Sequence, residues 1–458
     1  MADIDPRIFR AYDIRGKAHL QLTSEACNLI GQAFGGVVTE RTTDEFASVV
    51  VGRDARTHSP EFMNAAIAGL VAAGCRVLNM GQTPSPLNYF TICTRNLDGG
   101  VQITASHNPA EDNGIKLQTK HAEAYAGEDL QQLRKQIEAN DVKTGNGWEE
   151  HIDAITPYTE YLTNVFGGIG IGKTIVVDGG NGVAGPLYCD VLRKVGCKVV
   201  ELYIEPDGTF PNHAADPSKW ETLADLQKST KELGAHAGFA LDGDGDRFGM
   251  VDETGTIRTA DEILLLLAKD HLSRNPGAPV IFTVSNSGTL QTEITKWGGR
   301  PVMCKVGHSF VEHAMRENNA LLGGEQSGHF FCGEDYFSFD DALVGVLRVL
   351  SIMKKESVSS LMKDFPKVYQ AQERRPHCAD DVKAQVIQKI RDHFAATYPV
   401  VDLDGARIDF GDGAWAGIRM SNTSPCLSVC LEARSPEKLA EIEKLVLEHL
   451  GTYEEIEM

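Results

Sequence analysis

The sequence predicts an α/β protein with three related α/β domains and a smaller C-terminal α+β domain. Strand, loop and helix patterns recur from Ser48, Thr174 and Pro279, and in each repeat a later strand ends in a polar loop. From Val368 onward, alternating strand patterns are flanked by amphipathic helices instead. A chain of 458 residues is also too long for one core, so three or four domains are expected.

We place the four predicted domains at residues 1–150, 151–253, 254–367 and 368–458. The first boundary follows a linker-like stretch, Lys143–Gly147. In the first domain the dipeptide Asn113-Gly114 predicts a turn. The strands expected in this domain cover 48–51, 75–78, 101–103 and 115–117, and the helices cover 62–73 and 128–137.

The later domains carry the same kinds of pattern. The strands expected there cover 174–177, 198–202, 238–241, 279–284, 300–304, 321–322, 407–410, 416–420 and 427–431. Helices are expected over 187–195 and 382–394. A last helix should begin with Ser435 as its N-cap and Pro436 at its first position.

Composition excludes several classes of partner. The formal net charge of −20 argues against nucleic acid or an anionic membrane surface. No apolar run approaches the roughly 18 residues of a membrane span, and the first ten residues carry charges where a signal peptide would be apolar. The ten cysteines show neither a disulfide framework nor a zinc spacing, so we expect a cytoplasmic protein with reduced thiols.

The first polar loop is Thr104–Pro109. It places Ser106 and His107 directly after a strand, and Asn108-Pro109 prevents a helix or strand from continuing. A serine is a poor nucleophile unless a base, a metal or a prior modification activates it. The loop therefore indicates either a reactive serine or an ordinary turn.

The second polar loop alternates Asp242, Asp244 and Asp246 with glycines, so three carboxylates can approach one point. Oxygen ligands of this kind suit Mg²⁺ or Ca²⁺, and the alternative is a solvated acidic turn. A helix-loop-helix calcium site would also have Glu253 at its last position, but it requires glycine where Arg247 stands. An aspartyl phosphatase of the haloacid-dehalogenase type would have Thr or Val in place of Asp246.

Three further segments carry candidate ligands. Arg419–Pro425 combines an arginine with short hydroxyl and amide side chains, which suits a phosphate group or a simple turn. Phe9–Gly16 contains two arginines and a tyrosine, which could bind an anion. The alternative is a surface loop with solvated charges. Gly324–His329 ends the strand of the third repeat. In open α/β sheets, ligands bind beyond the carboxyl ends of strands, and the Ser106 loop, Asp242–Arg247 and Glu325–His329 all fall at such ends.

With these loops in this order, the whole chain resembles the α-D-phosphohexomutases, and most of all their bacterial phosphomannomutase/phosphoglucomutase branch. The resemblance implies three related α/β domains and a fourth domain around a central cleft. It implies that Ser106 is carried as a phosphoserine, and that Mg²⁺ is held by a phosphoserine oxygen with Asp242, Asp244 and Asp246. Glu325 and Ser327 would bind sugar hydroxyls. The non-reacting phosphate would be held by Arg419, Ser421, Asn422 and Thr423.

The reaction implied is reversible phosphoryl transfer between the 1 and 6 positions of a hexose phosphate, through a hexose 1,6-bisphosphate. Such transfer needs mainly alignment and charge neutralisation, which Mg²⁺, Arg247 and Lys116 would supply. Lys116, His329 and Arg15 are candidates for the base, and the resemblance points to the first two. The remaining expected roles are sugar-phosphate contact for His308, positioning for His107, and phosphate binding for Tyr12 and Arg15.

Two sequence features separate the possible substrates. Thr283-Val284-Ser285-Asn286 lacks a lysine found in the most similar branch, and Gly324–His329 has the form common in phosphoglucosamine mutases. The Ser-Asn-Thr triplet after Met420 and Gly307-His308-Ser309 favour mannose and glucose phosphates, which we expect as substrates. Phosphoglucosamine mutase is the alternative, followed by an aspartyl phosphatase or a non-catalytic sugar-phosphate binder. We expect a monomer or weak homodimer.

Overall fold

The computed structural model describes residues 4–354, 356–421 and 424–458. Contacts within the chain define two compact units. Unit 1 comprises the residues up to Ile263 together with Ser327–Met362, and unit 2 comprises Leu264–Gln326 with Lys363–Met458. Among the helices of the described residues, none has the length and apolar character needed to cross a membrane.

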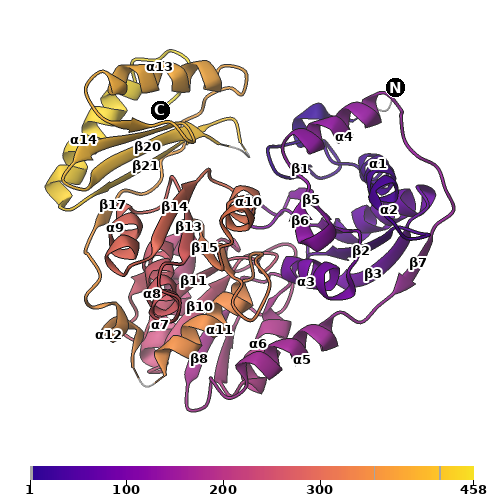
Figure 1. Ribbon diagram of the computed structural model, residues 1–458, viewed down its shortest axis with the longest axis horizontal. Helices are drawn as coiled ribbons and strands as arrows, with labels where there is room; N and C mark the ends of the chain where they lie inside the picture. Colours follow the sequence, from indigo (N-terminus) through magenta and orange to yellow (C-terminus); the bar gives the residue numbers. More distant parts are fainter. Residues whose placement is uncertain (1–3, 355, 422–423) are drawn as a thin grey trace. The chain divides into compact units, whose positions relative to one another are not determined.

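Unit 1 opens with a seven-stranded mixed sheet. Its elements are η1 (Pro6–Ile8), β1 (Ile14–Lys17), α1 (Ser24–Arg41), β2 (Ser48–Arg53), α2 (Ser59–Ala72), β3 (Arg76–Gln82), α3 (Ser85–Arg95), β4 (Gly99–Ile103), β5 (Asp112–Thr119), η2 (Lys120–Ala122), β6 (Glu123–Ala124), α4 (Glu128–Glu138) and β7 (Trp148–His151). The strand order is β1-β5-β4-β2-β3-β7, and β6 pairs with β5. Figure 1 shows α1 and α2 side by side, and their apolar residues share a core with β2 and β4. β4, which leads into Ser106, is buried along its whole length because it lies inside the sheet.

The predicted turn at Asn113-Gly114 is wrong, because both residues lie within β5. They pair with Gly16 and Arg15 of β1. A Cβ atom on Gly114 would lie 2.4 Å from the carbonyl oxygen of Ile14, so the glycine permits a close backbone approach. The Asn113 side chain donates to Ser59 Oγ inside the protein instead of forming a turn.

A second sheet of unit 1 has the strand order β12-β11-β10-β8-β9. β8 runs parallel to β9 and β10, whereas β10 and β11 form an antiparallel pair. The acidic loop Asp242–Arg247 connects β10 to β11. The elements are α5 (Ile155–Phe166), β8 (Thr174–Asp178), α6 (Gly185–Lys194), β9 (Lys198–Leu202), η3 (Trp220–Leu223), α7 (Ala224–Glu232), β10 (Ala237–Leu241), β11 (Phe248–Asp252) and β12 (Ile257–Arg258).

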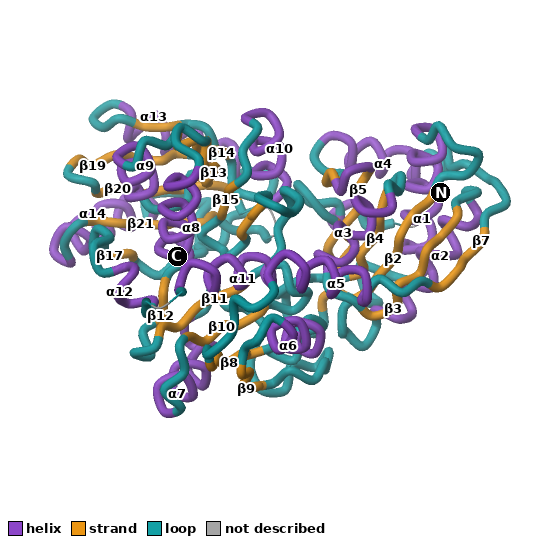
Figure 2. The backbone as a smooth tube through the Cα atoms, turned by 60° about the horizontal axis from the view of Figure 1, so that its bottom comes forward, coloured by secondary structure: helices purple, strands orange, loops and turns teal. Residues whose placement is uncertain are grey.

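The later segment of unit 1 contains β16 (Phe330–Cys332), α11 (Ala342–Met353) and α12 (Val358–Met362). Figure 2 shows α11 beside α5, which it contacts. An aromatic cluster joins this segment to α3 and α5. Its members stack or meet edge to face, and they are Tyr89, Phe90, Tyr158, Tyr161, Tyr336, Phe337 and Phe339.

Unit 2 combines parallel strands with an antiparallel C-terminal sheet. β13 pairs in parallel with both β14 and β15. The C-terminal sheet has the order β17-β21-β20-β19-β18, and α13 and α14 pack on it. The elements are β13 (Pro279–Thr283), α9 (Gly288–Lys296), β14 (Arg300–Cys304), α10 (His308–Asn318), β15 (Leu322–Gly324), β17 (Tyr369–Gln370), α13 (Lys383–Ala395), β18 (Val400–Val401), β19 (Ala406–Gly411), β20 (Ala414–Met420), β21 (Leu427–Ala433) and α14 (Pro436–Leu450). Helix α8 (Ala260–Arg274) begins in unit 1 and continues into unit 2.

The structure confirms the predicted α/β class and the change of pattern near the C-terminus. The predicted N-cap is also correct, since Ser435 Oγ accepts a hydrogen bond from the backbone N–H of Lys438 at 3.2 Å.

Candidate active site

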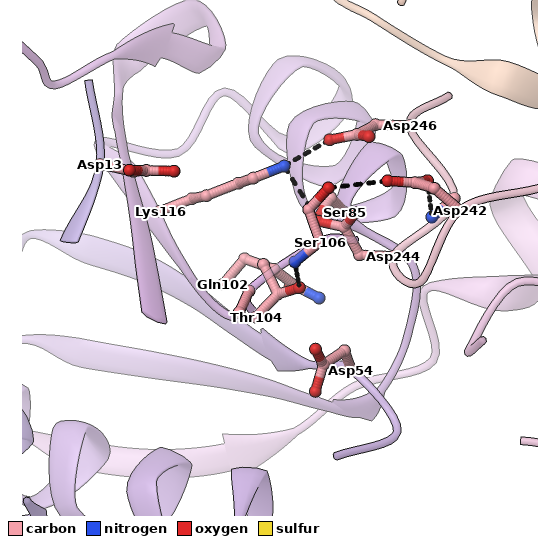
Figure 3. A network of polar contacts seen from close by, with 12 residues as sticks. Asp13, Asp54, Ser85, Gln102, Thr104, Ser106, Lys116, Asp242, Asp244 and Asp246 are labelled. Atoms are coloured by element: carbon pink, nitrogen blue, oxygen red, sulfur yellow. Dashed lines mark hydrogen bonds and ion pairs between the residues drawn. The ribbon is translucent and has the colours of Figure 1, made fainter. Parts of the chain in front are cut away.

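Ser106 lies in a sharp, buried turn at the end of β4. Its φ of 50° is in the left-handed region, which few residues other than glycine adopt without strain. The backbone N–H of Ser106 donates to Thr104 Oγ1 at 2.9 Å, which helps to hold this conformation. The turn directs the Ser106 hydroxyl toward the acidic loop (Figure 3).

Two charged side chains of the acidic loop bind the Ser106 hydroxyl. Ser106 Oγ donates to Asp242 Oδ2 at 2.7 Å and accepts from Arg247 Nη2 at 3.0 Å. Arg247 also donates from Nε to Asp242 Oδ2 at 3.0 Å. Ser106, Asp242 and Arg247 therefore form a closed, buried triangle. It joins the first and second sheets of unit 1.

His107 lies beside this triangle, with Nδ1 3.2 Å from Ser106 Oγ. Desolvation and the positive charges of Arg247 and Arg15 lower the pKa of His107 well below its usual value. Its imidazole is therefore neutral, and it can orient the hydroxyl but adds no charge.

Asp242, Asp244 and Asp246 are fully buried, and one oxygen atom of each lies within 4.8 Å of the others. Among the described residues, Asp244 Oδ1 and Asp246 Oδ1 have no hydrogen-bond donor. Burial and the charge of Asp246 raise the pKa of Asp242 well above its usual value, because three carboxylates in one buried site repel one another. Buried carboxylate oxygens that lack donors fit a hard divalent cation, so the predicted metal-binding loop suits such an ion.

Lys116 extends from β5 to the same carboxylates (Figure 3). Its Nζ donates to Asp244 Oδ2 at 2.9 Å and to Asp246 Oδ2. Burial acts to lower the pKa of Lys116, but Asp244 and Asp246 outweigh it and raise the pKa well above its usual value. The ammonium is therefore charged in this environment.

The loop before β16 brings Ser327 and His329 to the acidic loop. Ser327 Oγ lies 2.9 Å from His329 Nδ1. His329 Nε2 lies 3.6 Å from Asp246 Oδ1 and 3.7 Å from Asp340 Oδ2. The backbones of Arg247 and His329 also form an isolated β-bridge, which fixes the histidine beside the acidic loop.

Arg15 is buried against the Ser106 loop. Its Nε donates to Asp13 Oδ2 at 2.6 Å, and its Nη1 donates to the Ala105 carbonyl at 3.1 Å and Asn108 Oδ1 at 2.9 Å. Tyr12 is half-buried in the bend before β1. Unit 1 thus brings together most of the predicted residues, namely Ser106, His107, Lys116, Asp242, Asp244, Asp246, Arg247, Ser327, His329 and Arg15.

Four further predicted residues, Glu325, His308, Arg419 and Ser421, lie in unit 2. Glu325 is buried at the end of β15 and accepts from the Gly307 backbone N–H at 2.7 Å, next to His308 at the start of α10. Arg419, in β20, donates from Nε to Ser285 Oγ at 3.3 Å. Ser421 is described, whereas Asn422 and Thr423 lie outside the described residues.

The sequence did not identify several residues at these sites. Arg375 Nη2 donates to Ser421 Oγ at 2.9 Å, and Lys383 Nζ donates to the carbonyls of Ser421 at 3.1 Å and Ser424 at 2.6 Å. Asp340 lies near His329, and Ser85 Oγ donates to Asp244 Oδ2. Each contact joins residues far apart in sequence or on separate elements, so no local motif indicates it.

The Ser106 hydroxyl lies between Asp242, a carboxylate of the cluster that suits a metal ion, and the guanidinium of Arg247. This arrangement suits phosphoryl transfer, which needs alignment and charge neutralisation. The models of the phosphoglucomutase/phosphomannomutase family match most of the chain. Alpha/beta/alpha domains I, II and III match residues 6–144, 149–255 and 259–369, and the C-terminal domain matches residues 370–449.

Individual relatives agree with this match. The chain is 41% identical over 440 residues to a phosphomannomutase/phosphoglucomutase of Pseudomonas aeruginosa, covering 95% of this chain and 93% of that protein. It is 37% identical to a phosphoglucomutase of Neisseria meningitidis, covering 97% and 96% of the two chains. A crystal structure of a phosphoglucomutase/phosphomannomutase family protein from Burkholderia thailandensis superposes with a TM-score of 0.90 at 36% identity, covering 98% of each chain.

The chain therefore belongs to the phosphoglucomutase/phosphomannomutase family, as the resemblance predicted, and it is a hexose-phosphate mutase enzyme.

Proposed function

We propose that this enzyme moves a phosphoryl group reversibly between the 1 and 6 positions of mannose and glucose phosphates. The observation that carries the proposal is the position of Ser106 Oγ, 2.7 Å from Asp242 Oδ2 and 3.0 Å from Arg247 Nη2. A phosphoryl group on this oxygen would lie beside Asp242, which can bind a cation, and beside the positively charged guanidinium of Arg247. Both favour transfer, because charge develops on the phosphoryl oxygens.

In the proposed reaction, phosphorylated Ser106 meets a hexose monophosphate. The bond between phosphorus and Ser106 Oγ breaks as a bond from phosphorus to a sugar hydroxyl oxygen forms. The hydroxyl proton passes to a base, and Ser106 Oγ takes a proton from an acid as it leaves. The resulting hexose 1,6-bisphosphate turns over and returns its other phosphoryl group to Ser106 Oγ. Ser106 Oγ gives its proton to the base, the leaving sugar oxygen takes a proton from the acid, and the phosphoserine is restored. The bisphosphate is thus both an intermediate and the activator that phosphorylates free enzyme.

Mg²⁺, held by Asp242, Asp244 and Asp246, would neutralise charge on the phosphoryl group when bound. Arg247 donates to Ser106 Oγ and orients it. Lys116 and His329 are the proposed proton carriers, through Nζ and an imidazole nitrogen. The support for Lys116 is its position, since Nζ lies within the carboxylate cluster and donates to Asp244 and Asp246, beside the loop that binds Ser106 Oγ.

The remaining residues have proposed roles in binding. Glu325 would accept hydrogen bonds from sugar hydroxyls, and the Ser327 hydroxyl would donate to them or accept from them. His308 would contact the sugar phosphate. Arg419 and Ser421 would hold the non-reacting phosphate, together with Asn422 and Thr423. The support for this phosphate site is that Arg375 donates to Ser421 Oγ and Lys383 donates to the Ser421 carbonyl. Two cationic side chains thus bind this loop, and each also pairs with a carboxylate, Glu373 or Asp380. Tyr12 and Arg15 would bind phosphate near Ser106.

We also propose a monomer or weak homodimer in the cytoplasm, with domain boundaries near residues 150, 253 and 367. All ten cysteines belong to the described residues and have free thiols, which supports a reducing compartment.

Mass spectrometry of the purified enzyme tests the phosphoserine. We expect phosphate on Ser106 after incubation with glucose 1,6-bisphosphate, and we expect Ser106→Ala to lose it along with nearly all mutase activity. A hydroxylamine-labile phosphate on Asp242 would support the aspartyl-phosphatase alternative instead. A fully active Ser106→Ala variant would contradict the proposed mechanism.

Parallel assays with mannose, glucose and glucosamine 1-phosphates test the substrate. We expect kcat/KM for mannose and glucose 1-phosphates to exceed that for glucosamine 1-phosphate by at least about tenfold, which corresponds to roughly 1.4 kcal/mol. The reverse order would identify a phosphoglucosamine mutase.

A further inference from the structure

The side chain of Arg56 lies beneath the Ser106 loop and is only 1% exposed. It follows β2 in the chain, fifty residues before Ser106. Its guanidinium group carries five N–H bonds in one plane, and all five are used. Nε donates to Asp54 Oδ2, Nη1 donates to the carbonyls of Pro109 and Asp112, and Nη2 donates to the carbonyls of Ser106 and Asn108.

Two of these hydrogen bonds, to the carbonyls of Asn108 and Pro109, are short, and the other three have ordinary lengths. Those to the four carbonyl oxygens are 3.0 Å for Ser106, 2.6 Å for Asn108, 2.5 Å for Pro109 and 2.9 Å for Asp112. Four carbonyl oxygens that converge on one buried point repel one another unless a positive group lies between them. The conformation of residues 106–112 therefore depends on the guanidinium of Arg56.

Asp54 holds Arg56 in this position. Its Oδ2 accepts from Arg56 Nε at 3.1 Å, and its Oδ1 accepts from the Arg56 backbone N–H at 3.0 Å and from Ser59 Oγ at 2.6 Å. The Asp54 backbone N–H donates to the Ile103 carbonyl, at the end of the strand that leads to Ser106. The guanidinium also lies over the ring of Phe210, at 5.2 Å from its centroid. Rotation of the guanidinium would break several of these contacts at once.

We propose that Arg56, oriented by Asp54, is a positioning residue that keeps Ser106 in the geometry for phosphoryl transfer. The inference deepens the proposed function and rests on it. Ser106 has a positive φ, which is retained only where the surroundings impose it. The hydrogen bond from Arg56 to the Ser106 carbonyl fixes the residue whose Oγ must align with the phosphoryl group. Misplacement of a reacting group by about 1 Å can reduce a rate by about 100-fold.

The first test compares Arg56→Lys with Arg53→Lys. Arg53 ends the same strand, but it donates to the Asp54 carbonyl and Gln82 Oε1 and has no hydrogen bond to residues 105–112. Lysine offers three donors from one nitrogen and cannot reproduce the planar fork of arginine. We expect Arg56→Lys to lower kcat about 100-fold while KM stays within about threefold of the parent value. For Arg53→Lys we expect both kcat and KM to stay within about threefold of the parent values. A kcat for Arg56→Lys within threefold of the parent would overturn the proposal.

The second test is chemical rescue. In Arg56→Ala, added guanidinium ion can enter the space of the missing side chain and again supply a planar set of donors. We expect guanidinium at millimolar concentration to restore kcat at least about tenfold, while it leaves the parent and Arg53→Lys unchanged. A merely structural role would show as a lower melting temperature without this rescue, and that result would contradict positioning.

Hydrogen–deuterium exchange separates this proposal from the proposed function. The backbone amides of residues 105–108 and 110–112 should exchange at least about tenfold faster in Arg56→Lys than in Arg53→Lys, whatever the substrate is. Equal exchange in the two variants would overturn the positioning role. If the parent isomerises no hexose phosphate, the proposed function fails, and the exchange result still decides whether Arg56 holds the loop.

Asp54→Asn provides a variant that keeps the guanidinium, in case Arg56 variants do not fold. Asparagine retains an oxygen that can accept from the Arg56 backbone, but it loses the charge that binds Nε. We expect kcat to fall about tenfold and exchange in residues 105–112 to increase. An unchanged kcat together with unchanged exchange would overturn the role of Asp54.

Discussion

The ammonium nitrogen of Lys116 lies 2.9 Å from Oδ2 of Asp244. Asp244 belongs to the cluster of three aspartates that suits a divalent cation. The same nitrogen also donates to Asp246 Oδ2. One buried positive charge thus binds two of the three acidic side chains of the metal-binding loop. Lys116 and a bound cation would then repel each other across a short distance with little solvent between them.

Replacing Lys116 by methionine should have opposite effects on metal binding and on catalysis. Mg²⁺ should bind more tightly, because the repelling ammonium is gone, and the rise in melting temperature on adding Mg²⁺ should exceed that of the parent. The value of kcat should fall by about 100-fold or more, since a proton carrier is lost. Calorimetric titration with Mg²⁺, thermal melts with Mg²⁺ or EDTA, and mutase assays measure these effects.

Lys120→Met is the matched control, because Lys120 is exposed just beyond β5. It should change neither Mg²⁺ affinity nor kcat. Weaker Mg²⁺ binding by Lys116→Met would show that the ammonium supports the cation site rather than opposing it.

Gly243→Ala should destabilise unit 1 and impair the site. A Cβ at this position would lie 2.3 Å from the Ser106 carbonyl oxygen, which Arg56 also binds. The two loops would have to separate, at a cost of about 1–3 kcal/mol. Urea denaturation of parent and variant measures the loss, and mutase activity should fall as well.

Gly451→Ala is a suitable comparison for this substitution. Its nearest neighbour would be 3.4 Å from the new Cβ, an ordinary contact, so the free energy of unfolding should change by no more than about 0.5 kcal/mol. Equal urea midpoints for Gly243→Ala and the parent would mean that the two loops separate without loss of free energy of unfolding.

Lys383→Met should weaken substrate binding more than it slows chemistry. Lys383 Nζ joins the carbonyls of Ser421 and Ser424, so its loss frees the loop proposed to hold the non-reacting phosphate. Loss of hydrogen bonds from a charged group costs about 1.5–3 kcal/mol, which predicts an increase in KM of about tenfold or more. Steady-state kinetics provide both constants.

Lys389→Met is the matched control, because Lys389 lies on the same helix as Lys383. This substitution removes only an ion pair with Glu455 near the surface. Its KM should remain within about twofold of the parent. If kcat rather than KM changes in Lys383→Met, the loop acts on the chemical step and the proposed binding role is incorrect.

Asp341 should make stability depend on pH in the weakly acidic range. Burial raises the pKa of Asp341 to about 6, even though hydrogen bonds from Tyr336, Val344 and Tyr158 oppose this effect. Between the usual value of 3.8 and about 6, the folded protein binds more protons than the unfolded protein, so stability falls as pH rises. A shift of about two units corresponds to roughly 3 kcal/mol.

Urea midpoints of the parent and Asp341→Asn at pH 4 to 7 provide the comparison. The parent should lose this stability as pH rises to about 6, and above that pH the loss is complete. The asparagine variant cannot ionise at this position, so its profile should be flatter. Parallel profiles would mean that the environment of Asp341 does not resist its ionisation.

The sequence predicted the architecture because strands, turns and caps leave local patterns. Ser435 and Pro436 marked a helix start from a few adjacent residues, and the glycines between the aspartates marked a loop that gathers carboxylates. The failure at Asn113-Gly114 shows the limit of such patterns. Whether that glycine permits a turn or a close strand pair depends on β1, almost a hundred residues earlier.

The residues that the sequence did not reveal act across long separations. Arg56 binds carbonyls fifty or more residues away, and Lys383 binds a loop about forty residues away. Carbonyl groups are present in every residue, so their clustering around a cation has no counterpart in side-chain patterns. The roles of the individual site residues and the domain boundaries stay predictions.

The aromatic cluster has a consequence for how the chain unfolds and how it can be divided. Its rings come from α3, α5 and the segment after β16, so three of the predicted domains contribute to one small core. A fragment ending near residue 150 would expose Phe90, which is only 2% exposed in the whole chain. Such a fragment should aggregate, and unit 1 should unfold in a single cooperative transition. Chimaeras that exchange domains with a relative would need to carry all the rings of this cluster together.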